Sequence, residues 1–444
     1  MKVMVVGSGG REHAISWALA KSPRVDTVVC VPGNGGTAYE TKCVNIDPAA
    51  YSCPPQLGEL ERYVYIATQE GCAFAVIGPE APLAAGLADM LEDAGIPAVG
   101  PRKQAAQLEA SKDAAKQFMK KYGIACAKSE SFRDPEQAHK YIDEQGAPIV
   151  IKADGLAAGK GVVVAKTAEE AHAAIRDFME KDTLGGAGAT VIIEEYLTGT
   201  EISMFAAVCA APKLTDAARS CITPLMYARD HKRLHDGAQG PNTGGMGAVA
   251  PLTDITAQQY DDFIQYIYMP TFAGIVAEGW DYRGFLFFGL MLTKDGPKLL
   301  EYNVRLGDPE TQALLPLLDS DFAELCEGLA GGKLGDCGVS WKQGFVCAPV
   351  AVSGGYPGSY EKGKRISIDN SRYDAEHVKI FIAGAKAADG GRLETSGGRV
   401  LSAAAYGTTA QEARSRAYEA LEAVSFDGMF YRRDIGLPGA ADST

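Results

Sequence analysis

One stretch of the chain, an apolar run that ends in a lysine and leads into a glycine-rich loop, most constrains the possible fold. The run is Pro148-Ile-Val-Ile-Lys152, and a second apolar run follows at 162–165. Two short apolar runs separated by glycines predict a β-hairpin with the loop at its tip. Glycines let backbone N–H groups approach anionic oxygens, and lysines add positive charge, so we expect this loop to bind a polyphosphate. The loop residues concerned are Gly155, Gly159, Lys160 and Gly161.

Two other interpretations of this stretch compete with a phosphate-binding hairpin. A P-loop has the pattern Gly-x-x-x-x-Gly-Lys-Ser/Thr and leads into a helix, whereas Lys160 is followed by Gly161 and a β-branched run. The sequence therefore argues against a P-loop. An ordinary flexible hairpin that binds no ligand also explains this stretch when it is considered alone. The motifs in the rest of the chain distinguish the two interpretations.

The first 100 residues alternate short apolar runs with helical patterns, which predicts a βαβ series and a parallel sheet. In such a sheet, ligands bind at the carboxyl ends of the strands. Glycine-containing turns fall there, at 7–13, 32–36 and 78–82. The predicted strands are 3–6, 27–31, 73–78 and 98–100, and the predicted helices are 11–21, 55–70 and 82–94.

The first of these turns, Gly7-Ser-Gly-Gly-Arg-Glu-His13, comes close to a dinucleotide-binding fingerprint but departs from it twice. Glu12 holds the position of the third glycine, and the second strand ends at Val31-Pro32 without an acidic residue for a ribose hydroxyl. We therefore expect no nicotinamide cofactor. Glycine N–H groups at a helix N-terminus with an arginine nearby still suit one phosphate, although a tight strand-to-helix turn explains the motif as well.

The middle of the chain, from about 124 to 195, alternates strands and helices in a compact α+β pattern, behind a helix that Ser111 is expected to cap. Its last strand, 190–195, ends in two glutamates and is followed by Tyr196-Leu197 and Glu201. An apolar slot with carboxylates beside it suits adenine and ribose. Paired glutamates at a strand end are otherwise a solvated edge.

Residues 228–247 form a long polar stretch between a predicted strand, 219–227, and a predicted helix, 256–278. Structureless loops of this length inside compact domains usually have a function. We expect a cradle for an anion or an amine, and a disordered surface loop is the alternative. The charged and small residues of the stretch are Asp230, His231, Lys232, Arg233, Asn242, Thr243, Gly244 and Gly245.

A later strand, predicted at 298–303, brings Glu301, Asn303 and Arg305 to one face, because side chains alternate along a strand. The two oxygen donors suit Mg²⁺, and the guanidinium suits a phosphoryl oxygen. A buried salt-bridge triad would explain the same row. The acidic residues that follow it favour a metal-bound triphosphate.

The last part of the chain, from 336 to about 430, predicts strands at 345–353, 378–386 and 399–407 and a helix at 409–423. No catalytic cluster stands out in it. We therefore expect a closing domain that helps to line the substrate site.

Charge and cysteine usage narrow the classes of function. The chain has 43 basic and 56 acidic residues, and this net charge of −13 argues against nonspecific binding to nucleic acid or anionic membranes. No apolar run is long enough to span a bilayer, and the ten cysteines lack zinc-ribbon spacing. We expect a cytoplasmic monomer with small-molecule substrates, no nucleic acid partner and no membrane partner.

Five motifs, in the same order over essentially the whole chain, resemble the phosphoribosylamine–glycine ligase family, also called glycinamide ribonucleotide synthetases, of the ATP-grasp superfamily. The most specific are Asp230-His-Lys-Arg233 and Arg305-x-Gly-Asp-Pro-Glu-Thr-Gln312. The others are Gly7-x-Gly-Gly-Arg-Glu-His13, Ile151-Lys-Ala-Asp-Gly-Leu-Ala-Ala-Gly-Lys-Gly161 and Gly240-Pro-Asn-Thr-Gly-Gly-Met-Gly247.

The resemblance implies a ligase of de novo purine biosynthesis that uses ATP and Mg²⁺ or Mn²⁺. Such an enzyme joins glycine to 5-phospho-D-ribosylamine through a glycyl phosphate intermediate and forms glycinamide ribonucleotide, ADP and phosphate. The implied fold is α/β, with an N-terminal parallel-sheet domain that binds substrate, an ATP-grasp domain with a small α+β lid, and a C-terminal α+β domain. The corresponding bounds are 1–101, 102–330 with the lid at about 124–195, and 336–434.

Carried over residue by residue, the resemblance implies a role for each matching position. The catalytic residues would be Arg305, Lys152, Asp230 and Lys232. ATP would be bound by Lys112, Lys152, Gly155, Gly159, Lys160, Gly161, Glu194, Glu195, Leu197 and Glu201. Glycine and phosphoribosylamine would be bound by Gly9, Gly10, Arg11, Gly78, Pro79, Glu80, His231, Arg233, Asn242, Thr243, Gly244, Gly245 and Asp308. The metal ligands would be Glu301 and Asn303.

The chain departs from the family pattern at a few positions. Ser8 stands where many members have Asn and Leu306 where many have Phe, and both changes leave the backbone roles intact. Gly289 stands where many ATP-grasp enzymes have a further acidic metal ligand, so fewer protein ligands are expected here.

Three other functions compete with the glycine ligase. Another ATP-grasp ligase or a carboxylase would differ in the substrate pocket, and the stretches 230–233 and 305–310 argue against it. A non-catalytic nucleotide-binding protein would tolerate the loss of Glu301 or Arg305, yet both are present. An NAD-dependent oxidoreductase would need the nicotinamide cofactor that the first glycine turn disfavours.

Overall fold

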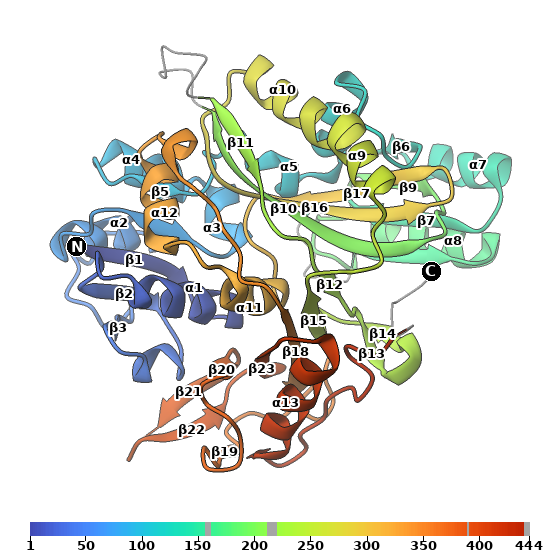
Figure 1. Cartoon of the computed structure of the whole chain (residues 1–444). Helices are drawn as coiled ribbons and strands as arrows, with labels where there is room; N and C mark the ends of the chain where they lie inside the picture. Colours follow the sequence, from blue (N-terminus) through green and yellow to red (C-terminus); the bar gives the residue numbers. More distant parts are fainter. Residues whose placement is uncertain (156–160, 211–219, 389, 439–444) are drawn as a thin grey trace.

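The computed structural model describes residues 1–155, 161–210, 220–388 and 390–438 of the chain. In Figure 1 the first strands lie to the left, the long strands of the middle part cross the centre, and most of the C-terminal strands lie below. None of the described helices is long and apolar enough to cross a membrane.

The N-terminal strands form a parallel sheet in the order β3-β2-β1-β4-β5, which confirms the predicted βαβ series. Alternate residues of a strand face opposite sides, so Val3 of β1 packs in one cluster with Ile15 of α1, and Met4 packs in another with Ile66 of α2. The bounds are β1 Lys2–Gly7, β2 Thr27–Pro32, β3 Cys43–Asn45, β4 Ala75–Ile77, β5 Ala98–Val99, α1 Gly10–Lys21 and α2 Glu59–Gln69.

Two details of this part differ from the sequence prediction. The strand β3 was not predicted, because it is a short edge strand whose Val44 is 51% exposed and it has no apolar pattern. The predicted helix at 82–94 is two helices, α3 (Glu80–Ala85) and α4 (Leu87–Asp93). Gly86 lies between them with φ of 100°, a left-handed conformation that ends a helix.

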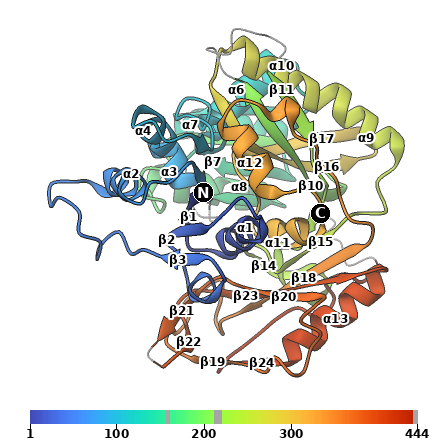
Figure 2. The same cartoon turned by 60° about the vertical axis from the view of Figure 1, so that its left-hand side comes forward.

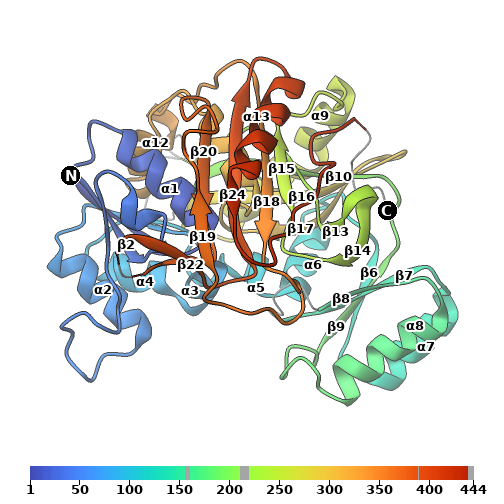
Figure 3. The same cartoon turned by 90° about the horizontal axis from the view of Figure 1, so that it is seen from below.

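A small antiparallel sheet in the order β6-β9-β7-β8 carries the lysine run, with α7 and α8 packed against it. This lid sheet stands away from the rest of the molecule at the lower right of Figure 3. Lys152 of β7 lies opposite Val162 of β8, which confirms the predicted hairpin, whereas Gly159 and Lys160 lie outside the described residues. The bounds are β6 Ser129–Phe132, α7 Pro135–Gln145, β7 Ile149–Ala153, β8 Val162–Ala165, α8 Ala168–Ile175 and β9 Val191–Glu195.

A second antiparallel sheet, in the order β11-β10-β16-β17, forms the floor of the middle part. Aromatic rings fill the space between it and the helices, and Phe263 meets Phe288 edge-on at a ring distance of 5.3 Å. Glu301 of β17 lies opposite Gly289 of β16. The bounds are α5 Gln107–Ala110, α6 Lys112–Lys121, β10 Thr200–Ala210, β11 Cys221–Pro224, α9 Ala257–Phe263, α10 Met269–Ala277, β16 Tyr282–Thr293 and β17 Gly296–Asn303.

The prediction of a structureless loop at 228–247 is wrong. The stretch holds the short strands β12 (Arg229–Asp230), β13 (Arg233–His235) and β14 (Gln239–Asn242), and β15 (Gly247–Ala250) begins at its end. β13 pairs with β14, whereas β12 and β15 join the C-terminal sheet in the order β12-β15-β18-β23-β20. Because β15 pairs with a strand about a hundred residues later, the local sequence gives no sign of this pairing.

The C-terminal part adds α13 to that sheet and a smaller sheet in the order β21-β22-β19-β24. The predicted strand 378–386 is two strands in different sheets, because the chain turns at Ala383-Gly384. Figure 2 shows α1 directly above β20 and β23. The bounds are α11 Glu310–Leu314, α12 Phe322–Ala330, β18 Phe345–Val352, β19 Arg365–Ile368, β20 Val378–Ile382, β21 Ala385–Ala388, β22 Arg392–Thr395, β23 Arg399–Gly407, α13 Ala410–Glu422 and β24 Val424–Ser425.

Candidate active site

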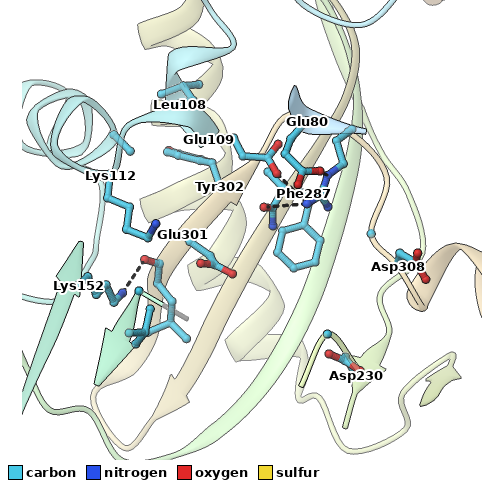
Figure 4. Close-up of a pocket in the computed structure, with 18 of the residues that line it drawn as sticks. Glu80, Leu108, Glu109, Lys112, Lys152, Asp230, Phe287, Glu301, Tyr302 and Asp308 are labelled. Carbon is cyan, nitrogen blue, oxygen red and sulfur yellow. Dashed lines mark hydrogen bonds and ion pairs between the residues drawn. The ribbon is translucent and has the colours of Figure 1, made fainter. Parts of the chain in front are cut away.

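Candidate residues from distant parts of the sequence meet in one cavity of about 420 Å³, between the lid sheet and the floor sheet. Figure 4 shows Lys112 and Lys152 on one side of Glu301 and Asp230 and Asp308 on the other. The sequence-predicted residues that line the cavity are Glu80, Lys112, Lys152, Gly161, Glu194, Asp230, Lys232, Thr243, Gly244, Glu301, Asn303, Arg305 and Asp308.

At the lid end of the cavity, a buried glutamate binds two lysines. The Glu194 carboxylate lies 3.0 Å from Nζ of Lys152 and 3.2 Å from Nζ of Lys116. Burial lowers the pKa of Lys116 below its ordinary value although Glu194 opposes the shift. Lys116 was not predicted, because a further lysine on the lysine-rich helix α6 is usually solvent-exposed.

The cavity wall formed by β17 carries the predicted metal ligands. Burial alone would raise the pKa of the Glu301 carboxyl, but nearby cations lower that pKa below its ordinary value, so Glu301 is ionised at neutral pH. Those cations are Lys232, Lys152, Lys112 and Arg305. The amide oxygen of Asn303 accepts a long hydrogen bond of 3.4 Å from Arg305. The arrangement concentrates positive charge around two oxygen donors.

Arg305 is oriented by two carboxylates. Its terminal nitrogen lies 2.7 Å from the Glu109 carboxylate, and its Nε lies 3.6 Å from Glu80. Glu109 also accepts the backbone N–H of Val304 at 2.7 Å, and burial raises its pKa although Arg305 opposes this shift. Glu109 was not predicted, because its position in the short helix α5 looks solvent-facing in the sequence.

Lys232, from the polar stretch, also lines the cavity, and its charge acts on Glu301. It pairs with the carboxylate of Glu201 at 2.8 Å, and Glu201 is the main reason why the pKa of Lys232 is raised. Lys232 therefore stays protonated. Glu201 was expected at a ribose, but in the structure its carboxylate binds this lysine and does not line the cavity.

Two carboxylates, the partly buried Asp230 and the buried Glu310, lie at the end of the cavity away from the lid lysines (Figure 4). Burial, and then the nearby Glu310 carboxylate, raise the pKa of Asp230 well above its ordinary value. Oδ1 of Asp230 is buried without a hydrogen-bond partner among the residues that the structure describes, whereas Glu310 accepts the hydroxyl of Ser203 at 2.8 Å. Asp230 therefore has a free acceptor atom and a higher proton affinity than an exposed aspartate.

Arg399, at the start of β23, reaches this end of the cavity from the C-terminal part. It donates to the backbone oxygens of Gly244 and Asp308 and lies 3.1 Å from the Asp308 carboxylate. Burial would raise the pKa of Asp308, yet Arg399 and Arg11 lower it. The hydroxyl of Tyr356 accepts the N–H of Gly244 at 2.9 Å. Side chains of the C-terminal part therefore bind both the N–H and the carbonyl oxygen of Gly244. No sequence signal marked Arg399 or Tyr356.

Glu12 explains the departure from a dinucleotide fingerprint. Its carboxylate accepts the N–H of Gly9 at 2.6 Å and the Nε of Arg11 at 2.6 Å, and a Cβ at Gly78 would collide with it. Arg11 is buried and also donates to the carbonyl of Leu306. The Gly9 N–H that was expected to face a substrate phosphate is therefore bound to Glu12.

Several other predicted residues do not line the cavity. Glu195 faces outward, as alternation along β9 requires, and accepts the N–H of Lys128. His231 is buried against the carbonyl of Gly247, and Arg233 donates to the carbonyl of Gly240. The further predicted residues outside the lining are Gly9, Gly10, Arg11, Gly78, Pro79, Gly155, Leu197, Asn242 and Gly245.

Comparison with known proteins covers nearly the whole chain. Family models described as the N domain, the ATP-grasp (A) domain and the C domain of phosphoribosylglycinamide synthetase match residues 1–109, 110–311 and 346–438. The chain is 44% identical to a phosphoribosylamine–glycine ligase of Clostridium acetobutylicum, over 98% of this chain and 99% of that protein. It is 45% identical to one of Neisseria meningitidis, over 98% of each.

Solved structures show the same resemblance at the level of the fold. A crystal structure of phosphoribosylamine–glycine ligase from Thermotoga maritima superposes with a TM-score of 0.81 at 37% identity, covering 98% of this chain and 100% of that one. The biotin carboxylase domain of a Hydrogenobacter thermophilus 2-oxoglutarate carboxylase, solved with MgADP, superposes with a TM-score of 0.71 at 16% identity, covering 97% and 91%. These comparisons confirm the predicted resemblance and the predicted fold class.

Proposed function

The chain belongs to the phosphoribosylglycinamide synthetase family, and on that premise we propose that the cavity around Glu301 and Arg305 is its active site. The protein is an ATP-dependent ligase of purine biosynthesis. It joins glycine to phosphoribosylamine, and it uses ATP and a divalent metal. The observation that carries the site assignment is the cluster of cations around the ionised Glu301.

ATP would lie with its base at the lid end and its phosphates toward Glu301. Met119, Val162 and Leu300 give the lid end an apolar slot, and the Lys152–Glu194 pair places a donor and an acceptor beside it. Lys112 and Lys152 would then reach the phosphates, together with the glycine-rich loop of the hairpin. Point charges and backbone donors of this kind suit a polyphosphate.

Glu301 and Asn303 would hold the metal, which we propose to be Mg²⁺ or Mn²⁺. An ionised carboxylate and an amide oxygen are hard donors that suit such ions, and the described residues of the cavity lining include no cysteine or histidine. A bound metal of this kind neutralises charge on the transferred phosphoryl group. The position opposite Glu301 is Gly289, so we expect solvent and nucleotide oxygens to complete the coordination.

We propose a reaction in two steps. A carboxylate oxygen of glycine first attacks the γ-phosphorus of ATP, the bond to the bridging oxygen breaks, and glycyl phosphate and ADP form. The amine of phosphoribosylamine then attacks the glycyl carbonyl carbon, a proton leaves the nitrogen, and phosphate departs. Arg305 would bind the transferred phosphoryl group with its planar guanidinium, and Lys232 would bind the glycine carboxylate.

Asp230 is our candidate for accepting the amine proton. A general base works best when its pKa lies near the working pH, and burial with Glu310 nearby raises the pKa of Asp230. Its Oδ1 atom is also without a hydrogen-bond partner in the described part of the chain. Asp308, with its lowered pKa, would stay ionised and bind a hydroxyl or the amine of the sugar.

Further properties of the enzyme are proposed on the same basis. The phosphoribosylamine surface would come from residues 1–101 and the ATP surface from residues 102–330, in which 124–195 form the lid. The closing surface would come from residues 336–434. We propose that the enzyme acts as a monomer on the small-molecule substrates glycine and phosphoribosylamine. The ten cysteines are free thiols, the state that a reducing compartment such as the cytoplasm maintains.

The assignment of substrates is tested by ADP release. The enzyme is supplied with Mg²⁺, ATP, glycine and freshly generated phosphoribosylamine, and each component is then omitted in turn. We expect ADP only when both glycine and phosphoribosylamine are present at once. ADP release that continues without the amine, or that bicarbonate supports in place of glycine, would overturn the assignment.

A further inference from the structure

A second cavity, of about 600 Å³, lies between α1, the segment 316–343 and the edge of the C-terminal sheet at β20 and β23. It shares no lining residue with the active-site cavity. α1 runs between the two regions, because Arg11 near its start donates to the carbonyl of Leu306, whereas Lys21 at its end lines the second cavity. The proposed reaction assigns no task to this cavity.

Three lysines converge on the second cavity in a chain whose net charge is −13. Lys379 pairs with Glu40, but Lys21 and Lys342 make no ion pair with any residue that the structure describes. Lys342 donates only to the carbonyl of Pro316, at 3.0 Å. Burial, and then the charges of Lys342 and Lys379, lower the pKa of Lys21, so these ammonium groups lie close enough to repel one another.

The carboxylates of the lining do not neutralise these lysines. Asp319 and Glu376 line the same cavity, yet within the described chain neither forms an ion pair with a lysine. A bound anion would relieve the repulsion between Lys21 and Lys342. Phosphate is an anion that lysine ammonium groups commonly bind as point charges.

Aromatic rings also line the second cavity, and the ammonium group of Lys21 lies over the ring of Trp17, 4.2 Å from its centroid. Trp17 and Trp341, two of the three tryptophans of the chain, line it together with Tyr406. The ring of Tyr406 is stacked with His377 at 6.2 Å and an interplanar angle of 19°. Lysines beside partly exposed aromatic rings can bind a phosphate and a flat ring at the same time.

We propose that this second cavity is a binding site for a phosphorylated aromatic small molecule of the nucleoside monophosphate class. Lys21, Lys342 and Lys379 surround the phosphate, and Trp17, Trp341 and Tyr406 contact the ring. The cavity volume lies within the range of about 300–1,000 Å³ that is typical of sites for small ligands. The site is distinct from the ATP site, and its existence does not depend on the proposed reaction.

The test is a titration of the full-length enzyme followed by tryptophan fluorescence, after the active site has been saturated with ADP and Mg²⁺. Adenosine monophosphate, adenosine and inorganic phosphate are the probes. We expect adenosine monophosphate to change the fluorescence saturably and to bind at least about tenfold more tightly than either partial probe, because each partial probe lacks one set of contacts. If phosphate alone bound as tightly as adenosine monophosphate, the proposed contacts to the ring would be wrong. If adenosine bound as tightly, the proposed contacts to the phosphate would be wrong.

Lysine variants test whether adenosine monophosphate binds in the second cavity. Lys21→Glu combined with Lys342→Glu should weaken binding of adenosine monophosphate by at least about tenfold, because attraction becomes repulsion, and Lys342→Gln alone should weaken it less. Lys333→Glu is a matched control, since Lys333 is exposed and does not line the cavity. All variants should turn over like the wild type without the probe. Unchanged affinity in the folded double variant, measured by calorimetry, would overturn the proposal.

Trp17→Phe combined with Trp341→Phe separates the two sites. This variant keeps Trp280, which stacks on Phe118 of α6 at a ring distance of 5.3 Å and so remains as a reporter packed on the helix that carries Lys112 and Met119 of the active-site lining. We expect the fluorescence response to adenosine monophosphate to disappear while the response to ADP persists. A response to the monophosphate that survives in this variant would assign it to the ATP site and contradict the proposal.

Discussion

Arg305 shows how individual side chains of the active site are held in place. Glu109 binds one terminal nitrogen at 2.7 Å and is itself fixed by the Val304 N–H. The guanidinium is therefore oriented before any substrate arrives, and orientation of this kind is the main contribution that a protein makes to phosphoryl transfer. The row Glu301, Asn303 and Arg305 was predicted from strand alternation, whereas its support by Glu109 was not.

Replacing Arg305 by lysine tests this orientation. Arg305→Lys keeps the positive charge but loses the planar fork, so we expect kcat to fall by about 10²–10³-fold with little change in the KM for ATP. Arg24→Lys, at an exposed arginine paired with Glu327, is the matched control and should leave kcat unchanged. Steady-state rates give kcat for both variants, and thermal melts show whether each variant is folded. A normal rate for folded Arg305→Lys would show that Arg305 has only a structural role.

Asp230 predicts a dependence of stability on pH. Its folded-state pKa is raised, so over a range above about pH 4 the native state binds a proton that the unfolded state has lost. Stability then falls as pH rises through that range. As pH rises above about 4, the melting temperature of the wild type should fall more steeply than that of Asp230→Asn. Parallel curves for the two proteins would show that Asp230 titrates normally.

At the level of strands and helices, local patterns were predictable and long-range pairings were not. The strands β1, β2, β7 and β8 follow from apolar runs bounded by glycines, and Lys152 was correctly assigned to a strand end. In contrast, β15 pairs with β18 across the sequence, and the polar composition of the stretch before it suggested a loop. Arg399 was missed for a similar reason, because β23 pairs with β18, the strand that β15 joins from the other side.

The strand β23 therefore carries a testable functional residue. Arg399→Met should raise the KM for glycine or phosphoribosylamine by about 10–100-fold, since it removes charge-assisted hydrogen bonds to Gly244 and Asp308, and should leave the KM for ATP unchanged. Arg365→Met replaces an exposed arginine of β19 and is the control. An equal loss of affinity for ATP would indicate general damage to the fold and contradict a local role.

In the whole molecule, the C-terminal part is not self-contained. Its sheet has β15 along one edge of β18, and β15 lies outside the predicted segment 336–434. A fragment of 336–444 would expose the edge of β18, and unprotected strand edges aggregate. We expect this fragment to aggregate when expressed alone and to form a soluble complex when co-expressed with residues 1–335. Gel filtration distinguishes these outcomes, and a soluble monomeric fragment with a cooperative melt would contradict the expectation.

The most direct test of the proposed reaction follows an oxygen atom through the active site. If glycine is activated as glycyl phosphate, one carboxylate oxygen of glycine leaves with the phosphate. Turnover with glycine labelled with ¹⁸O in its carboxylate is therefore expected to give inorganic phosphate that carries one ¹⁸O, as read by mass spectrometry. Phosphate without ¹⁸O, formed in step with glycinamide ribonucleotide, would contradict the glycyl phosphate intermediate and the roles that we assign to Arg305 and Lys232.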